Sequence, residues 1–323
     1  MTNRRRFISG MAALSLAPLA GEALAQEYPN KPIRLIGTTQ PGGGADVCAR
    51  LVAERLRELL GVAVLVENQT GATGNIALQS TSRAPADGYT LAFPTAANTA
   101  NLAARPKQAF DILGELRPVG KVGVAAFTLA VSPALGVSTV EQFIEQARRR
   151  KDLAYASIGH GSSQHLVAEM FCDAAKVDMT HVPYRGEAAA MQDLMSGRVH
   201  AMFMAGAKPM MDAGKVVGLA TTNKTRWPAI PELRPIGEVP SLRGFYYNGW
   251  NGVMAPKDTP DAVIQKLSAA LGKALQDEKL RAGLRGAGYE AGAGASAEMA
   301  EQLQWDVGNF KRIIAERKLT FPE

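Results

Sequence analysis

The chain alternates between short apolar runs and longer amphipathic stretches. Residues 62–66 form an apolar run without a polar position, which is typical of a strand buried on both faces, and a shorter strand is predicted at 33–36. Between them, apolar residues recur at helical spacing over 45–60, and Gly61 ends that stretch. The order strand, helix, strand predicts a βαβ unit with a right-handed crossover.

The same alternation continues to the end of the chain. Further strands are predicted at 89–93, 153–156, 179–182, 199–204 and 216–220, and 116–132 is predicted to be extended. Helices are predicted after the loops at 71–74 and 159–163, and at 138–149, 187–195, 260–276, 278–285 and 297–315. This pattern predicts an α/β protein with mostly parallel sheets. The order strand, glycine-rich loop, helix occurs twice, at 35–60 and 155–175, which indicates two similar lobes.

The first glycine-rich loop, residues 41–46, precedes the predicted helix. Gly42, Gly43 and Gly44 let backbone N–H groups approach a ligand, and the helix N-terminus behind them favours negative charge. A carboxylate or phosphate suits that place; the alternative is a tight turn that binds nothing. The loop is neither GxGxxG nor GxxxxGK[ST], so nucleotide binding is not supported. Asp46 is interpreted as a first-turn cap rather than a catalytic acid.

The second loop contains hydroxyl groups beside a histidine. Ser162 or Ser163, with His165 nearby, allows the hypothesis of a serine hydrolase. The stretch is not a G-x-S-x-G elbow, and no acid is placed to orient the histidine. Helix capping and hydrogen bonds to a ligand are the favoured interpretation.

The first 25 residues have the three parts of an export signal. Arg4, Arg5 and Arg6 precede an apolar stretch over 10–20, and Ala23-Leu24-Ala25 follows. We expect cleavage after Ala25. The arginine pair favours twin-arginine export, with a general secretion leader as the alternative. No cysteine follows the cleavage site, so no lipid anchor is expected there.

Composition is ordinary for a globular protein. The chain has 323 residues, 46% hydrophobic and 20% charged, which favours two domains and excludes wholesale disorder. The net charge of +6 is dispersed, so no nucleic-acid groove is expected. Cys48 and Cys172 are expected to be two buried thiols, the alternative being a bridge between the domains. The four histidines lack metal-ligand spacing, and no metal or cofactor is predicted.

Several stretches together resemble one family. They are Tyr28-Pro-x-Lys31-Pro-Ile-Arg34-Leu35, Pro41-Gly-Gly-Gly-x-Asp46, Val66-Glu67-Asn68, Gly71-Ala-x-Gly74-Asn75, Pro85-x-Asp87-Gly88-Tyr89, Tyr155-Ala-Ser, Gly161-Ser-Ser-x-His165-Leu166 and His181-Val-Pro-Tyr184-Arg185-Gly186. Their order and spacing are similar to those of TctC/Bug-type solute receptors of tripartite tricarboxylate transporters, over essentially the whole chain after the leader.

The resemblance implies a periplasmic-binding-protein-like fold, with two α/β lobes, a ligand cleft and two hinge crossovers. Lobe one would comprise 26–123 and 222–323, and lobe two 124–221. It implies a monomeric periplasmic receptor without enzymatic activity. The receptor would bind a small carboxylate and deliver it to membrane components of a transporter, or feed a sensor system instead. A transcription-regulator effector domain shares this design, but the leader and the missing helix-turn-helix argue against it.

The resemblance also implies the ligand contacts. They are Thr39, Gln40, Gly42, Gly43, Gly44, Asp46, Ala72, Thr73, Gly74, Asn75, Thr95 and Ala96 in lobe one, and Ser162, Ser163, His165, Tyr184, Arg185, Gly186, Met204 and Ala205 in lobe two. Relatives usually have a proline and an aromatic residue at Thr38-Thr39, and an acidic strand end where this chain has Met204-Ala205. Plain di- or aromatic carboxylates are therefore expected to bind better than acidic amino acids.

Overall fold

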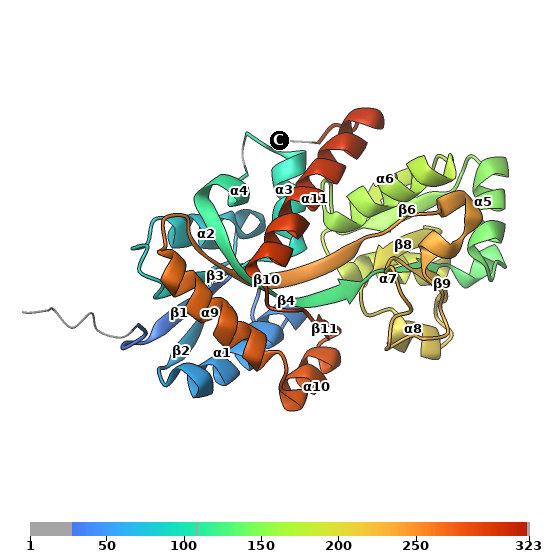
Figure 1. The fold of residues 1–323 in the computed structure, drawn as a ribbon. Helices are drawn as coiled ribbons and strands as arrows, with labels where there is room; N and C mark the ends of the chain where they lie inside the picture. Colours follow the sequence, from blue (N-terminus) through green and yellow to red (C-terminus); the bar gives the residue numbers. More distant parts are fainter. Residues whose placement is uncertain (1–27, 108, 322–323) are drawn as a thin grey trace, which may run out of the picture.

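Two separate β-sheets organise the chain, and the computed structural model describes residues 28–107 and 109–321. The first sheet has six strands in the spatial order β11-β4-β10-β3-β1-β2, and the second has five in the order β7-β6-β8-β5-β9. Figure 1 shows the sheets as the centres of two lobes, each flanked by helices, with the long strands β4 and β10 running between them. The predicted leader lies outside the described residues.

The strands of the first sheet are β1 (Ile33–Gly37), β2 (Val64–Asn68), β3 (Thr90–Phe93), β4 (Leu116–Ala126), β10 (Asn248–Pro256) and β11 (Glu290–Ala291). Those of the second are β5 (Thr128–Val131), β6 (Ala154–Ser157), β7 (Thr180–Pro183), β8 (Ala201–Met204) and β9 (Val217–Thr221). β1 is parallel to β2 and β3, and β6 is parallel to β7 and β8. β10 pairs antiparallel with β3 and β4, and β5 antiparallel with β8 and β9. The prediction of mostly parallel sheets was therefore wrong, because the crossing strands and β5 make both sheets mixed.

The helices flanking the first sheet are α1 (Gly44–Leu60), α2 (Asn75–Ser82), α3 (Ala96–Ala104), α4 (Ile112–Glu115), α9 (Asp261–Ala274) and α10 (Glu278–Gly286). Those of the second lobe are α5 (Val140–Arg149), α6 (Ser163–Ala175), α7 (Glu187–Ser196) and α8 (Lys208–Asp212), and the long α11 (Ser296–Glu316) follows last. Cys48 and Cys172 are buried free thiols in α1 and α6, as predicted. No helix within the described ranges has the length and apolarity needed to cross a bilayer.

The chain stays with the second lobe beyond β9. Thr222 donates its backbone N–H to the Phe127 carbonyl at 2.8 Å, and Thr221 donates to the Arg234 carbonyl at 3.0 Å. Trp227 and Ile230 are buried against Ala126. The sequence analysis placed the return to lobe one at residue 222. In the structure the chain returns to the first sheet only with β10.

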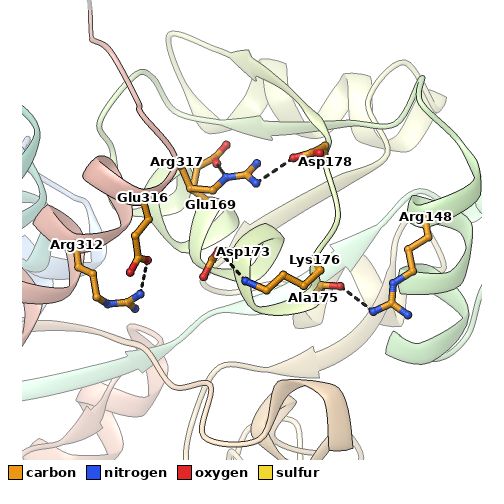
Figure 2. Close-up of polar contacts among 9 residues, drawn as sticks. All are labelled: Arg148, Glu169, Asp173, Ala175, Lys176, Asp178, Arg312, Glu316 and Arg317. Carbon is orange, nitrogen blue, oxygen red and sulfur yellow. Dashed lines mark hydrogen bonds and ion pairs between the residues drawn. The ribbon is translucent and has the colours of Figure 1, made fainter.

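Helix α11 connects the two lobes a third time. Near its start, the Ser296 hydroxyl donates to the Pro118 carbonyl of β4 at 2.7 Å. Just beyond its end, Figure 2 shows the Arg317 guanidinium between two carboxylates of the second lobe, with Nε 2.8 Å from Glu169 Oε2 and Nη1 2.9 Å from Asp178 Oδ1. Because Glu169 is almost fully buried, this ion pair fixes the end of α11 on α6.

A buried carboxylate anchors the middle of α11 to the first lobe. Asp306 Oδ2 accepts hydrogen bonds from Trp250 Nε1 at 2.6 Å and from the Thr99 hydroxyl at 3.0 Å, while Oδ1 accepts from Gln302 at 2.8 Å. Burial raises the pKa of this carboxyl to about 6, although the three hydrogen bonds oppose the shift. The carboxylate thus joins α11, α3 and β10.

Candidate ligand-binding site

Three loops leave the same edge of the first sheet. Because β1 is parallel to both β2 and β3, Gly37 at its end lies beside Asn68 and Phe93 at theirs. The loops 38–43, 69–74 and 94–95 are therefore neighbours. Ligands of open α/β sheets bind beyond the carboxyl ends of the strands, where these loops lie.

The first loop presents the uncapped start of α1. Gly42 has a φ of +83°, which favours glycine, while Gly43, the N-cap, has a φ of −74°. No side chain caps this helix, so the first-turn N–H groups have no partner within the helix. Gly42, Gly43 and Gly44 are exposed. Exposed N–H groups at the positive end of a helix dipole suit a carboxylate.

Asp46 organises this loop. Its Oδ2 accepts from the Gly42 N–H at 2.8 Å and from Arg50 Nε at 3.1 Å, and its Oδ1 accepts from Asn68 Nδ2 at 2.8 Å. Burial would raise the pKa of this carboxyl, but the hydrogen bonds from Arg50, Gly42 and Asn68 outweigh it and lower the pKa. Both oxygens are thus occupied within the protein. Thr39 is close by, because its carbonyl accepts from Asn68 Nδ2 at 3.1 Å, and Gln40 is exposed.

The second loop is strained. All four residues of Gly71–Gly74 have a positive φ, including 55° at the β-branched Thr73. Asn98 Nδ2 holds the turn by donating to the Thr73 carbonyl at 2.8 Å. A Cβ on Gly74 would lie 2.7 Å from Thr38 Cβ, so this loop packs directly on the first one. Strain of this kind concentrates at binding sites, and α2 also begins on a glycine without a side-chain cap.

In the third loop, neighbouring side chains accept the hydrogen bonds of the backbone N–H groups at the start of α3. Thr95 and Asn98 form a capping box at the start of α3, with the Thr95 N–H 2.9 Å from Asn98 Oδ1. Ala96 is buried, and the Asn75 side-chain oxygen accepts from Asn101 at 3.4 Å. These residues position the neighbouring loops.

The second lobe repeats the arrangement. The parallel strands β6, β7 and β8 end at one edge, so the loops 158–162, 184–186 and 205–207 leave it together. The Tyr184 N–H donates to the Ser157 carbonyl at 2.9 Å, which joins two of these loops. Ser162 caps α6 by accepting from the His165 N–H at 3.3 Å, and Ser163 is buried. The sheet edge again gathers residues that the sequence analysis singled out.

Helix α7 begins on a third glycine without a side-chain cap. Gly186 is its N-cap, and a Cβ there would meet nothing within 4 Å. Tyr184 beside it points its hydroxyl at Asp193 Oδ2, 2.7 Å away; burial and then this carboxylate raise the pKa of the phenol to about 12. Arg185 is exposed. The sequence analysis did not single out Glu187, whose pKa the surrounding desolvation raises.

Two predicted contacts occupy different environments. Met204 is 3% exposed and packs in the core of the second lobe, away from the loop surface. Ala205 is exposed at the strand end. Where the resemblance implies an acidic strand end, this chain thus has a buried apolar side chain and a small exposed one.

Three histidines approach one another, which the sequence analysis did not predict. Ligand atoms of His160, His165 and His181 lie within 4.8 Å of one another. The His165 and His181 rings are stacked, with centroids 3.7 Å apart and 10° between planes, so their in-plane lone pairs do not converge. His165 Nδ1 also accepts the Gly161 N–H at 3.0 Å, whereas metal ligands donate from that second nitrogen. The cluster fits packed neutral rings rather than a metal centre.

Burial accounts for that neutrality. Desolvation, followed by the other two histidines and Arg105, lowers the pKa of His165 to about 3. Desolvation and His160 lower the pKa of His181 to about 4. The same contacts bear on the hydrolase hypothesis: the Ser162 hydroxyl caps α6 and His165 Nδ1 accepts a backbone N–H, so neither is arranged for nucleophilic attack.

Comparison with known proteins places this architecture in a family. Residues 48–319 match the tripartite tricarboxylate transporter family receptor. The chain is 32% identical to BugT of Bordetella pertussis over 82% of each chain. The structure of Rpa4515 of R. palustris with adipate has a TM-score of 0.77 and 30% identity, covering 91% of this chain and all of that one. MatC of Rhodopseudomonas palustris with bound malate has a TM-score of 0.73 and 26% identity, covering 89% of this chain and all of that one. The chain therefore belongs to the tripartite tricarboxylate transporter receptor family.

Proposed function

We propose that this protein is a non-catalytic solute receptor that binds a small carboxylate between its lobes. One observation carries the proposal: in each lobe, helices without side-chain caps begin at the edge of the sheet where the parallel strands end. In lobe one, α1 and α2 begin on Gly43 and Gly74, and in lobe two α7 begins on Gly186, each without a side-chain cap. A carboxylate supplies the acceptors that these N–H groups lack.

The chemistry of two structural relatives supports the ligand class. Rpa4515 was solved with adipate and MatC with malate, and both are dicarboxylates. We further propose that the receptor acts in the periplasm after cleavage behind Ala25, and that it hands its ligand to membrane components of a tripartite tricarboxylate-type transporter. Intact mass of the exported protein tests the first point, since the mature chain should begin at Gln26.

A thermal-shift panel tests the ligand class. Adipate, malate, glutamate and the neutral diamide of adipate should be compared at equal concentration. A ligand at a hundred times its dissociation constant stabilises the fold by about 2.7 kcal/mol, which raises Tm by about 5 °C in a chain of this size. We expect the plain dicarboxylates to give the largest shift. A diamide that matches adipate, or a glutamate shift above both dicarboxylates, would contradict the proposed ligand class.

A further inference from the structure

The loop before α6 brings the two lobes into contact at the histidine cluster. Arg105, which follows α3 in the first lobe, donates from Nη2 to the His160 carbonyl of the second lobe at 3.1 Å. A Cβ on Gly161 would lie 2.7 Å from the Ala104 Cβ and 3.0 Å from Arg105 Nη1. The loop backbone therefore rests directly on the end of α3, and separation of the lobes here would break this contact.

Aromatic rings fill the contact. His160 meets His181 edge-on with centroids 5.0 Å apart, and Phe321, beyond the end of α11, meets His165 edge-on at 5.8 Å. The Arg105 guanidinium carbon lies 5.8 Å from the Phe321 ring centroid. The histidines are thus packed among rings on one side and a permanent cation on the other.

The charged groups around the cluster would not stabilise a protonated histidine. Arg105 faces it from α3. From β6, the Tyr155 ring stacks 5.1 Å from His181, and the Tyr155 hydroxyl donates to Glu169 of α6. That carboxylate also accepts from Arg317 at the end of α11, 2.8 Å away. Its charge is therefore balanced by Arg317, and a protonated histidine would face another cation instead of an anion.

We propose that His160, His165 and His181 form a pH-sensitive latch, which holds the lobes together while the rings are neutral and opens the cleft when they are protonated at acidic pH. The release of a carboxylate on opening rests on the proposed function; the opening itself does not.

The direction of the pH effect follows from the difference in histidine pKa between the two arrangements of the loop. With the loop against Arg105 and Phe321, as it lies in this structure, the pKa of His165 is about 3 and that of His181 about 4. When the loop leaves Arg105 and Phe321, water reaches the rings and their pKa values return toward about 6.5. Protons then bind the open form more tightly, so the open population grows as the pH falls below about 6.5. One histidine gives up to about a tenfold change between pH 7.5 and 5.5, and the stack that persists reduces this to roughly three- to tenfold.

Small-angle scattering of the ligand-free protein at pH 7.5 and 5.5 tests the latch. The radius of gyration of the wild type should rise at pH 5.5, and that of a His165→Asn/His181→Asn double variant should not. Asparagine keeps an acceptor for the loop N–H, as Asn98 does at the start of α3. His200→Asn is the matched control, because His200 Nδ1 also accepts a backbone N–H, from Ala154 at 3.0 Å, but lies outside the cluster; it should behave as the wild type.

Adipate titration calorimetry at the same two pH values separates this proposal from the carboxylate function. The wild-type dissociation constant should rise three- to tenfold at pH 5.5, and that of the double variant should stay constant. A radius of gyration that rises at pH 5.5 while adipate fails to bind at either pH would overturn the ligand class and leave the latch standing. A wild type with equal scattering at both pH values, or a double variant that expands like the wild type, would overturn the latch. Should the double variant fail to fold by circular dichroism, Arg105→Gln removes the cation that faces the rings and should reduce the rise in the radius of gyration between pH 7.5 and 5.5; an unchanged rise would then refute the latch.

Discussion

Replacing Gly43 by valine tests the anion site of the first lobe most directly. Gly43 has φ −74° and ψ 162°, which every L-residue can adopt. Its added Cβ would lie 3.6 Å from the Gln40 carbonyl, an ordinary contact. The sequence analysis placed the carboxylate at the loop of Gly42, Gly43 and Gly44, and the structure assigns the positive φ of this loop to Gly42. A valine here is therefore compatible with the backbone while its methyl groups crowd the start of α1.

The expected loss follows from the hydrogen bonds at stake. A hydrogen bond to a charged group contributes about 1.5–3 kcal/mol. Displacing the carboxylate from one first-turn N–H should therefore cost at least about 1.4 kcal/mol, or tenfold in the dissociation constant. The fold should lose less than about 1 kcal/mol, since a glycine N-cap contributes no side-chain hydrogen bond of its own.

Adipate titration calorimetry measures the first quantity and urea denaturation the second. Gly308→Val is the matched control, because Gly308 lies in α11 and a Cβ there meets nothing within 4 Å. The control should bind adipate like the wild type. If Gly43→Val is folded and also binds with wild-type affinity, the glycine loop serves only the turn and the site lies elsewhere.

Three further changes have defined outcomes. Thr73→Gly should raise the free energy of unfolding by about 1 kcal/mol, because glycine relieves the left-handed φ of 55°; lower stability in urea would contradict the strain. For Asp306, the raised pKa of about 6 means that stability is lost as the pH rises from about 4 through 6. Asp306→Asn should remove a difference of about 2 kcal/mol between the free energies of unfolding at pH 4 and pH 7.5; a variant that keeps the wild-type difference would refute this. Glu187→Gln should bind adipate about threefold more tightly by calorimetry, since it removes a negative charge from the first turn of α7, directly after Gly186; weaker binding would argue that this carboxylate contacts the ligand favourably.

The sequence analysis predicted those elements in which the spacing of apolar residues coincides with the buried face. Helix α1 carries a clean apolar stripe and ends at Gly61 with a φ of +71°, so both its type and its end could be predicted. β10 could not: its sequence, Asn248–Pro256, contains two glycines and two asparagines, which disfavour a strand, yet every residue is buried. Tertiary pairing with β4 and β3 on either side outweighs the local preference.

Helix α3 as a whole was not predicted, for a related reason. Its first residues are alanine, asparagine and threonine, without an apolar period. The capping box that begins it uses Asn98 where the usual pattern has glutamate or glutamine. The sequence analysis began the next helix at residue 138. In the structure its cap is Thr139, whose hydroxyl accepts from the Gln142 N–H at 3.2 Å, so α5 begins at Val140.

The glycine loops were visible in the sequence, but the contact between the lobes was not. His181 reaches the loop before α6 only because β7 pairs with β6 in a register that sets Tyr155 opposite His181. Register of parallel strands far apart in the chain is a tertiary property, so the residue spacing alone carried no signal for the cluster. Arg105 and Phe321 come from still more distant segments.

Two kinds of helix start occur at the two strand edges. α3 and α6 are capped by their own side chains, through Thr95 with Asn98 and through Ser162. These helices are therefore satisfied without a ligand, and they fix the loops and the histidine contact. α1, α2 and α7 begin on glycines and lack side-chain caps, so a bound carboxylate can supply their acceptors from both lobes at once. A ligand that bridges them favours closure through those N–H groups, while the histidine cluster, at the α3–α6 contact, weakens closure as the pH falls. A change at Gly43 should therefore alter ligand affinity at every pH, whereas a change at the histidines should remove the pH dependence of that affinity.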